Sequence, residues 1–130
     1  MKEMTVTPWE VSGSMDYDKL IREFGIKPMG KLPGVFNENL LFRRGIVFAH
    51  RDFEKILEAI KGKKPFVMMT GLMPSGEFHL GHMLLALQMV FYQKLGAKVY
   101  IAVADLEAYN ARQKNLEDLR KIAVDQYLLN

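Results

Sequence analysis

The sequence predicts an α/β fold, in which a parallel sheet with a helical crossover follows a small helical extension. Two apolar runs, Phe66–Thr70 and Lys98–Ala104, have the length and composition of buried strands. Leu80–Leu95, between them, is long and apolar enough for a helix. A strand, a helix and a strand in this order form a βαβ unit, whose strands are parallel and whose crossover is right-handed.

The extension is expected to occupy residues 1–62 and to contain two helices. The first begins near Ser14 and ends at Gly25, and the second follows Asp52, a capping residue, and ends at Gly62. The apolar residues of the first helix recur at helical spacing: Tyr17, Leu20, Ile21 and Phe24. Those of the second do the same: Phe53, Ile56, Leu57 and Ile60.

The stretch between these two helices is expected to be irregular at first and extended later. Residues 26–39 are rich in glycine, proline and asparagine, which favour a loop. Leu40–His50 is predicted to form a short strand or hairpin that bends at Gly45.

Residues 63–130 contain the βαβ unit and one further helix. Ligands of parallel sheets bind at the carboxyl ends of the strands, so we expect residues 70–75 and 105–109 to lie side by side. Asn115 is predicted to cap the last helix. The inward residues of that helix would be Leu116, Leu119, Ile122, Ala123 and Tyr127.

Composition limits the class of protein. The chain has 130 residues, of which 49% are hydrophobic and 25% charged, with a net charge of +3. It has no cysteine, which excludes disulfides and thiolate catalysis. The N-terminus has no signal-like apolar region, and no apolar run reaches the roughly 20 residues that cross a bilayer. We therefore expect a cytoplasmic protein without a membrane partner.

The turn between the first strand and the helix, residues 70–82, indicates a nucleotide site. Glycine and proline build a tight turn, and the N-terminus of the helix offers unpaired N–H groups and a partial positive charge to a phosphate. His79 and His82 share a face there and add donors. Gly81 between them lets a flat ring approach the backbone. We expect no metal, because helical ligand pairs more often stand four residues apart.

Residues 74–82 resemble the "HIGH" motif of class I aminoacyl-tRNA synthetases, in particular the tryptophanyl and tyrosyl subgroup of archaeal and eukaryotic type. Further blocks, in order, resemble the tryptophanyl enzymes of that type: Pro8–Val11, Asp16–Ile21, Arg43–Ile46, His50–Asp52, Lys64–Phe66 and Thr70–Gly71. The resemblance covers nearly the whole chain. It implies that residues 63–130 are the first half of a Rossmann-like catalytic domain, truncated at its end.

The resemblance also implies a function. The full-length protein would use ATP and Mg²⁺ to convert tryptophan to tryptophanyl-adenylate, transfer it to tRNA(Trp), and form a homodimer. His79 and His82 would be catalytic and contact the phosphates. The ATP-binding residues would be Thr70, Gly71, Pro74, Ser75, Gly76, His79, Gly81 and His82, with Gly81 against the adenine. The amino-acid-binding residues would be Met69, Gly71 and Glu107, with Glu107 accepting the indole N–H.

Other functions stay open because the sequence departs from the tryptophanyl pattern. Asp105-Leu106-Glu107 resembles the tyrosyl pattern, although tyrosyl enzymes carry histidine where Glu107 stands, so a tyrosyl-tRNA synthetase is the alternative. The lysine-rich "KMSKS" motif of the class is absent, so the 130-residue chain is expected to be inactive alone. The absence of this motif also leaves a further alternative open, namely that the protein is a non-catalytic module that binds nucleotide or a partner protein. A small nucleotidyltransferase is disfavoured by Leu72-Met73-Pro74.

Overall fold

The computed structural model describes residues 5–6, 11–12 and 17–129. It contains two compact units, Met1–Phe53 and Glu54–Asn130. The predicted start of the first helix, at Ser14, lies outside the described residues. The division expected between residues 62 and 63 concerns a catalytic domain and stays a prediction.

The described part of the first unit consists of short elements. Its strands pair antiparallel: β1 (Thr5–Val6) with β2 (Val11–Ser12), and β3 (Lys27–Pro28) with β4 (Ala49–His50). Its helical segments are α1 (Tyr17–Glu23), the 3-10 helix η1 (Gly34–Glu38) and α2 (Leu40–Arg43). α1 confirms the first predicted helix, which is followed by Gly25 with a φ of 57°.

The strand or hairpin predicted between Leu40 and His50 is wrong in its first part, because the chain forms α2 there. The Asn39 side chain caps this helix by accepting a hydrogen bond from the Leu41 N–H (2.9 Å). The Phe42 ring packs against the buried Phe36 ring at a centroid distance of 4.9 Å. Capping and aromatic packing outweigh the local preference for a strand. The predicted bend at Gly45 is confirmed, since its φ is 66°.

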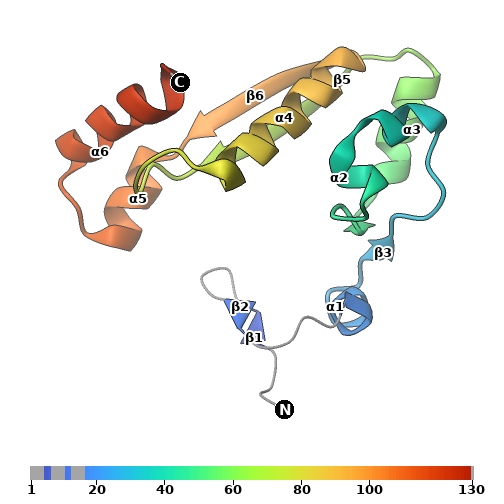
Figure 1. Cartoon of the computed structure of the whole chain (residues 1–130), viewed down its shortest axis with the longest axis horizontal. Coiled ribbons are helices and arrows are strands. Elements are labelled where there is room, and N and C mark those ends of the chain that lie inside the picture. Colours follow the sequence, from blue (N-terminus) through green and yellow to red (C-terminus); the bar gives the residue numbers. More distant parts are fainter. Residues whose placement is uncertain (1–4, 7–10, 13–16, 130) are drawn as a thin grey trace. The chain divides into compact units, whose positions relative to one another are not determined.

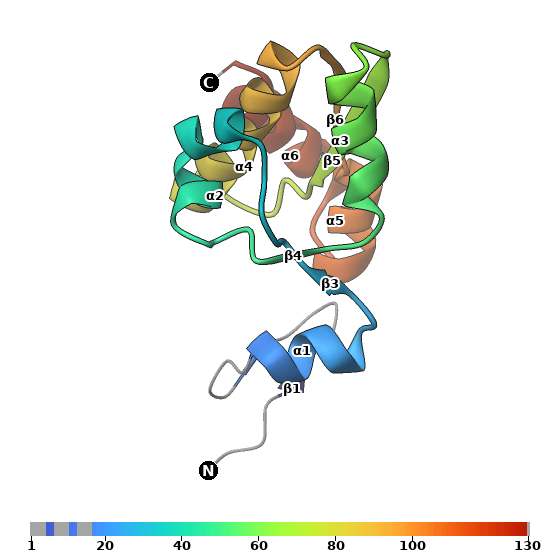
Figure 2. The ribbon, with the colours of Figure 1, turned by 90° about the vertical axis from the view of Figure 1, so that its right-hand side faces the viewer.

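The second unit carries the βαβ arrangement (Figures 1 and 2). Its elements are α3 (Phe53–Lys61, whose first residue belongs to the first unit), β5 (Phe66–Leu72), α4 (Leu80–Lys94), β6 (Ala97–Val103), α5 (Asp105–Arg112), α6 (Leu116–Ile122) and the π-helix η2 (Ala123–Leu128). The second predicted helix, the crossover helix and the capped last helix are confirmed. α5 was not predicted.

β5 and β6 are parallel, as the sequence predicts. Their register runs from Phe66 opposite Ala97 to Leu72 opposite Val103. α4 lies alongside the strand pair (Figure 1) and buries Met89, which is 5% exposed. Burial of such a side chain stabilises the fold by about 1.5–3 kcal/mol.

The prediction that these two strands are buried is wrong for several of their residues in the described chain. Val67 is 55% exposed and Met69 71% exposed, and across the pair Tyr100 and Ile101 are 47% and 48% exposed. The reason is that the described sheet has β5 and β6 alone, so α4 is its main cover. Among the described residues, no helix is long and apolar enough to cross a membrane.

Candidate functional site

The carboxyl ends of β5 and β6 lie together, which confirms the expected meeting of residues 70–75 with residues 105–109. The Ala104 N–H donates to the Leu72 carbonyl (2.8 Å), immediately before each chain leaves its strand. Thr70 lies within β5, as the predicted strand Phe66–Thr70 requires. Gly71 was expected in the turn but also lies within β5, because the strand continues to Leu72.

The turn itself, residues 73–79, is anchored by a proline. Pro74 is among the fully buried side chains of the unit. The Ser75 N–H donates back to the Met73 carbonyl (2.8 Å), which closes the turn. At Gly76 a Cβ atom would meet nothing within 4 Å, so this side of the turn is open. A fixed backbone therefore leads directly into α4.

His79 and His82 cap α4 reciprocally. His79 is the N-cap residue, and its Nδ1 accepts a hydrogen bond from the Gly81 N–H (3.1 Å). The His82 Nδ1 accepts from the His79 N–H (3.2 Å). This is a capping box with histidine in both roles. A backbone N–H can only donate, so each neutral ring carries its proton on Nε2.

The two rings are stacked, with their centroids 3.8 Å apart and an interplanar angle of 27°. Burial lowers the pKa of His82 below its ordinary value, and the neighbouring His79 lowers that pKa further. His82 is therefore neutral at pH 7, which its role as an acceptor requires.

The Gly81 position is restricted by the His79 ring. A Cβ atom at Gly81 would lie 3.1 Å from the His79 Cε1 and 3.2 Å from its Nδ1. A side chain here would thus require the His79 ring to shift slightly. The close contact with this ring is a structural reason for glycine at position 81, besides the predicted approach of an adenine.

Three side chains from the C-terminal part of the unit hold the turn. The Lys114 Nζ donates to the Ser75 carbonyl (2.9 Å) and the Tyr127 hydroxyl donates to the Gly76 carbonyl (3.2 Å). The Gln126 Oε1 accepts from the N–H of residue 78 (3.4 Å). The sequence did not identify these contacts with the turn: helical spacing predicted an inward Tyr127 but not what it would touch.

The amino-acid-binding candidates lie on other elements. Met69 is on β5 and exposed, and Glu107 is in the first turn of α5 with its side chain exposed. Near Glu107, Asp105 forms an ion pair with Arg120 (3.0 Å). The hydrogen bond from Arg120 is the main cause that lowers the pKa of this carboxyl group. Among the described residues, no hydrogen bond or ion pair joins Glu107 to the turn, so its role stays a prediction.

We expect acid to weaken the cap at α4. A protonated His82 cannot accept the His79 N–H, and the pKa of His82 is lower in the folded chain than in the unfolded chain. As the pH falls, the unfolded chain therefore binds a proton on His82 before the folded chain does. The contribution of His82 to the free energy of unfolding is thus fully present above pH 6.5, the ordinary pKa of histidine, and falls as the pH drops below it. Urea unfolding at about pH 8 and about pH 5 measures the loss.

His82→Gln is the matched control for this pH dependence. Glutamine at this helix position can still accept the capping bond and does not titrate. The loss of stability in acid should be smaller in His82→Gln than in the wild type. An equal loss in both would show that protonation of His82 is not its cause.

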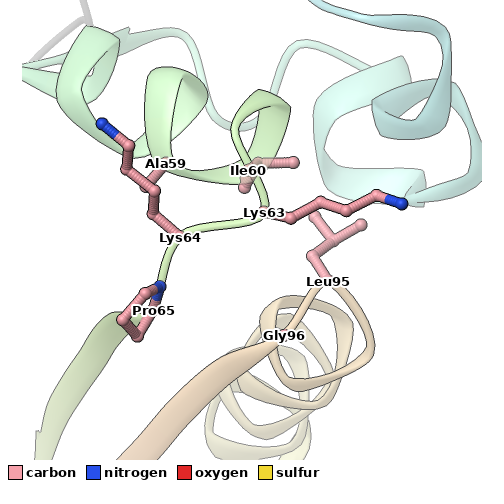
Figure 3. Close-up of a pocket in the computed structure, with 7 residues that line it drawn as sticks. All are labelled: Ala59, Ile60, Lys63, Lys64, Pro65, Leu95 and Gly96. Atoms are coloured by element: carbon pink, nitrogen blue, oxygen red, sulfur yellow. The ribbon is translucent and has the colours of Figure 1, made fainter.

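A second feature, a cleft of about 350 Å³, lies at the opposite end of β5 from the turn. Figure 3 shows its lining: Ala59, Ile60, Lys63, Lys64, Pro65, Leu95 and Gly96. The ammonium groups of the two lysines point away from each other, so they do not converge on a ligand. None of the predicted site residues lines this cleft.

Comparisons with known proteins place the turn within a family. The family described as tRNA synthetases class I (W and Y) matches residues 61–130. The tryptophan–tRNA ligase of Methanocaldococcus jannaschii is 43% identical over 131 residues, which cover 100% of this chain and 35% of that protein. The ligase of Thermoplasma acidophilum is 46% identical over 125 residues, covering 96% of this chain and 28% of that protein.

Solved structures agree with these relatives. The crystal structure of tryptophanyl-tRNA synthetase from Aeropyrum pernix K1 superimposes with a TM-score of 0.74 at 44% identity, covering 86% of this chain and 32% of that one. The tryptophanyl-tRNA synthetase from Encephalitozoon cuniculi, bound to tryptophan, superimposes with a TM-score of 0.73 at 33% identity, covering 84% of this chain and 33% of that one. The chain spans about a third of the length of these proteins.

The predicted resemblance is therefore confirmed, in fold and along the sequence. Since the family match covers more than half of the chain, including β5, the turn and α4, the chain belongs to the class I tRNA synthetases of the tryptophan and tyrosine group.

Proposed function

We propose that the chain is the first part of a tryptophan–tRNA ligase, whose full-length form activates tryptophan with ATP and transfers it to tRNA(Trp). The observation that carries the proposal is the reciprocal histidine cap on α4, in a chain whose relatives are tryptophan–tRNA ligases. Residues 63–130 would belong to the catalytic domain, and residues 1–62 to its N-terminal extension.

The chemistry of the turn fits a polyphosphate. With both Nδ1 atoms engaged in the cap, the Nε2–H groups of His79 and His82 are the remaining ring donors, and the His79 side chain is exposed. α4 has 15 residues, so its N-terminus carries the partial positive charge of a full helix dipole. The Lys114 ammonium adds a full charge beside Ser75. Together these groups favour a bound anion.

In the proposed reaction the tryptophan carboxylate attacks the α-phosphorus of ATP. A carboxylate–phosphorus bond forms, and the bond to the pyrophosphate oxygen breaks. His79 and His82 would hold the phosphates and stabilise the charge that develops on their oxygens, which is how enzymes of phosphate chemistry accelerate such steps. Mg²⁺ would enter on the phosphates, as this ion commonly does.

The remaining ATP-binding candidates would shape the turn around the nucleotide. Pro74 holds the turn from inside the fold, while Ser75 and Gly76 would line the side of the turn where a Cβ atom at Gly76 would meet nothing. Thr70 and Gly71 approach the site from the end of β5. The open space at Gly76 supports this arrangement, because the nucleotide needs a side of the turn that no side chain fills.

Tryptophan would bind at the end of β5 and the start of α5, against Met69, Gly71 and Glu107. If Glu107 accepts the indole N–H, Glu107→Ala in the full-length protein should weaken tryptophan binding by ~2–3 kcal/mol, because the bond involves a charged partner. Calorimetric titration with tryptophan measures this. Glu117→Ala is the matched control, since Glu117 is an exposed acid in the first turn of α6. Equal affinity in the Glu107 and Glu117 variants would exclude the role.

Amino-acid-dependent exchange of pyrophosphate into ATP tests the proposed function. In the full-length protein, which we expect to be a cytoplasmic homodimer, tryptophan should stimulate the exchange and tyrosine should not. The tyrosyl-like order Asp105-Leu106-Glu107 makes tyrosine the necessary comparison. Stimulation by tyrosine alone would assign the chain to the other branch of its family, and no stimulation by either would leave a non-catalytic module.

A further inference from the structure

Tyr127 reaches the nucleotide turn from the far end of the chain. It lies in the π-helix η2, a helix form that is frequent at functional sites. Its hydroxyl oxygen is 3.2 Å from the Gly76 carbonyl and 3.5 Å from the His82 Nε2. The rings of Tyr127 and His82 meet edge to face at a centroid distance of 5.1 Å, and the Phe78 ring is near both.

The direction of each hydrogen bond follows from the groups involved. The His79 N–H donates to the His82 Nδ1, so the neutral His82 ring carries its proton on Nε2. The Tyr127 oxygen can then only accept from this Nε2–H, and its own O–H is left to donate to the Gly76 carbonyl. The four residues form one continuous chain of bonds across the turn.

We propose that Tyr127 is a positioning residue, which fixes the ring plane of His82 at the start of α4 and so aims the Nε2–H, the tautomer itself being set by the bond from the His79 N–H. This proposal rests on the proposed function, because it takes from there the role of His82 in phosphate binding. At 3.5 Å the bond from Nε2 is long, so a phosphate oxygen can replace Tyr127 as the acceptor without a large cost. Tyr127 thus holds the donor ready and does not itself contact the nucleotide.

The surroundings support a role beyond the filling of space. The neighbouring Gln126 also bonds to the turn, through the N–H of residue 78. Two successive residues of η2 therefore fix the backbone that leads into the His79 cap, at residues 76 and 78. Burial raises the pKa of Tyr127, so its hydroxyl keeps the proton that it donates to Gly76.

Tyr127→Phe tests the proposal, because it keeps the ring contacts and removes the hydroxyl group alone. The first measurement uses the 130-residue chain at a pH above the titration range of His82 and reads the nuclear Overhauser effects between the His82 ring and the rings of residues 78 and 127. The wild type should show the contacts of a single ring plane, and Tyr127→Phe should show weaker contacts from a ring that samples several planes. Tyr100→Phe, which removes an exposed hydroxyl on β6, should resemble the wild type. Unchanged His82 ring contacts in Tyr127→Phe overturn the proposal, and thermal unfolding checks that both chains are folded.

The second measurement is pyrophosphate exchange in the full-length protein. Tyr127→Phe should lower kcat about tenfold, the scale of a slightly misplaced catalytic group, while the KM for ATP stays within about twofold. A His82 ring that samples several planes in Tyr127→Phe, together with an unchanged kcat, overturns the link to the reaction. Wild-type protein that shows the single ring plane but no exchange would instead contradict the proposed function, so the two failures are distinguishable.

Discussion

His82→Ala in the full-length protein should slow adenylate formation by ~10²–10³, because a preorganised donor to the developing charge is worth ~3–4 kcal/mol in the transition state. Tryptophan binding should change much less, since the ring is placed at the N-terminus of α4 and not on the elements proposed to hold the amino acid. Single-turnover formation of the adenylate, measured beside equilibrium tryptophan binding, separates the two effects.

A capping role alone could also slow the reaction, since the alanine variant loses the bond from the His79 N–H as well. His82→Gln distinguishes the two roles, because glutamine can accept the capping bond but lacks the ring. We expect His82→Gln to unfold like the wild type and to react as slowly as His82→Ala. If His82→Gln forms the adenylate at the wild-type rate, His82 acts only as a capping residue.

The 130-residue chain alone should not aminoacylate tRNA, and its exchange rate should be lower than that of the full-length protein by about 10³-fold or more. In the proposed function the turn would supply one wall of an ATP site. In the family that the sequence resembles, the KMSKS lysines form the opposite wall and meet the leaving pyrophosphate, and the chain has no such motif. Loss of a cationic clamp in other phosphoryl-transfer enzymes has an effect of this size.

The assay compares the purified chain with the full-length protein, in pyrophosphate exchange and in tRNA charging. The exposed apolar residues of the sheet, such as Met69 and Ile101, should make the short chain associate as its concentration rises. Light scattering measures this association. Turnover by the short chain within about tenfold of the long one would show that the second wall is dispensable.

The βαβ unit could be predicted from the sequence because each of its elements is long and has a clear local pattern. α2 and α5 could not. α2 contains one strand-favouring aromatic residue, Phe42, and it forms because Asn39 caps it and Phe36 packs against that ring. α5 begins directly after β6 at Asp105 and has no side-chain cap, so neither a turn nor a capping residue marks its start.

The site could be predicted in part for the same physical reason. The position of His79 and His82 at the start of a helix follows from the local sequence. Their shared face follows from their spacing of three residues. Their use of each other as capping partners depends on ring rotations that no sequence pattern records. The bonds from Lys114 and Tyr127 join residues separated by 39 and 51 positions, so they arise only when η2 and the segment before α6 pack against the turn.

The proposal that this turn binds ATP is tested most directly by titration of the chain with ATP and Mg²⁺, followed by NMR signals of the histidine rings and glycine amides. The signals of His79, His82 and Gly81 should shift and saturate together, while the His50 ring, which belongs to the first unit, should not shift. Saturable shifts confined to the cleft around Lys63 and Lys64, or no shift at His79 and His82 at any concentration reached, would contradict the proposed site.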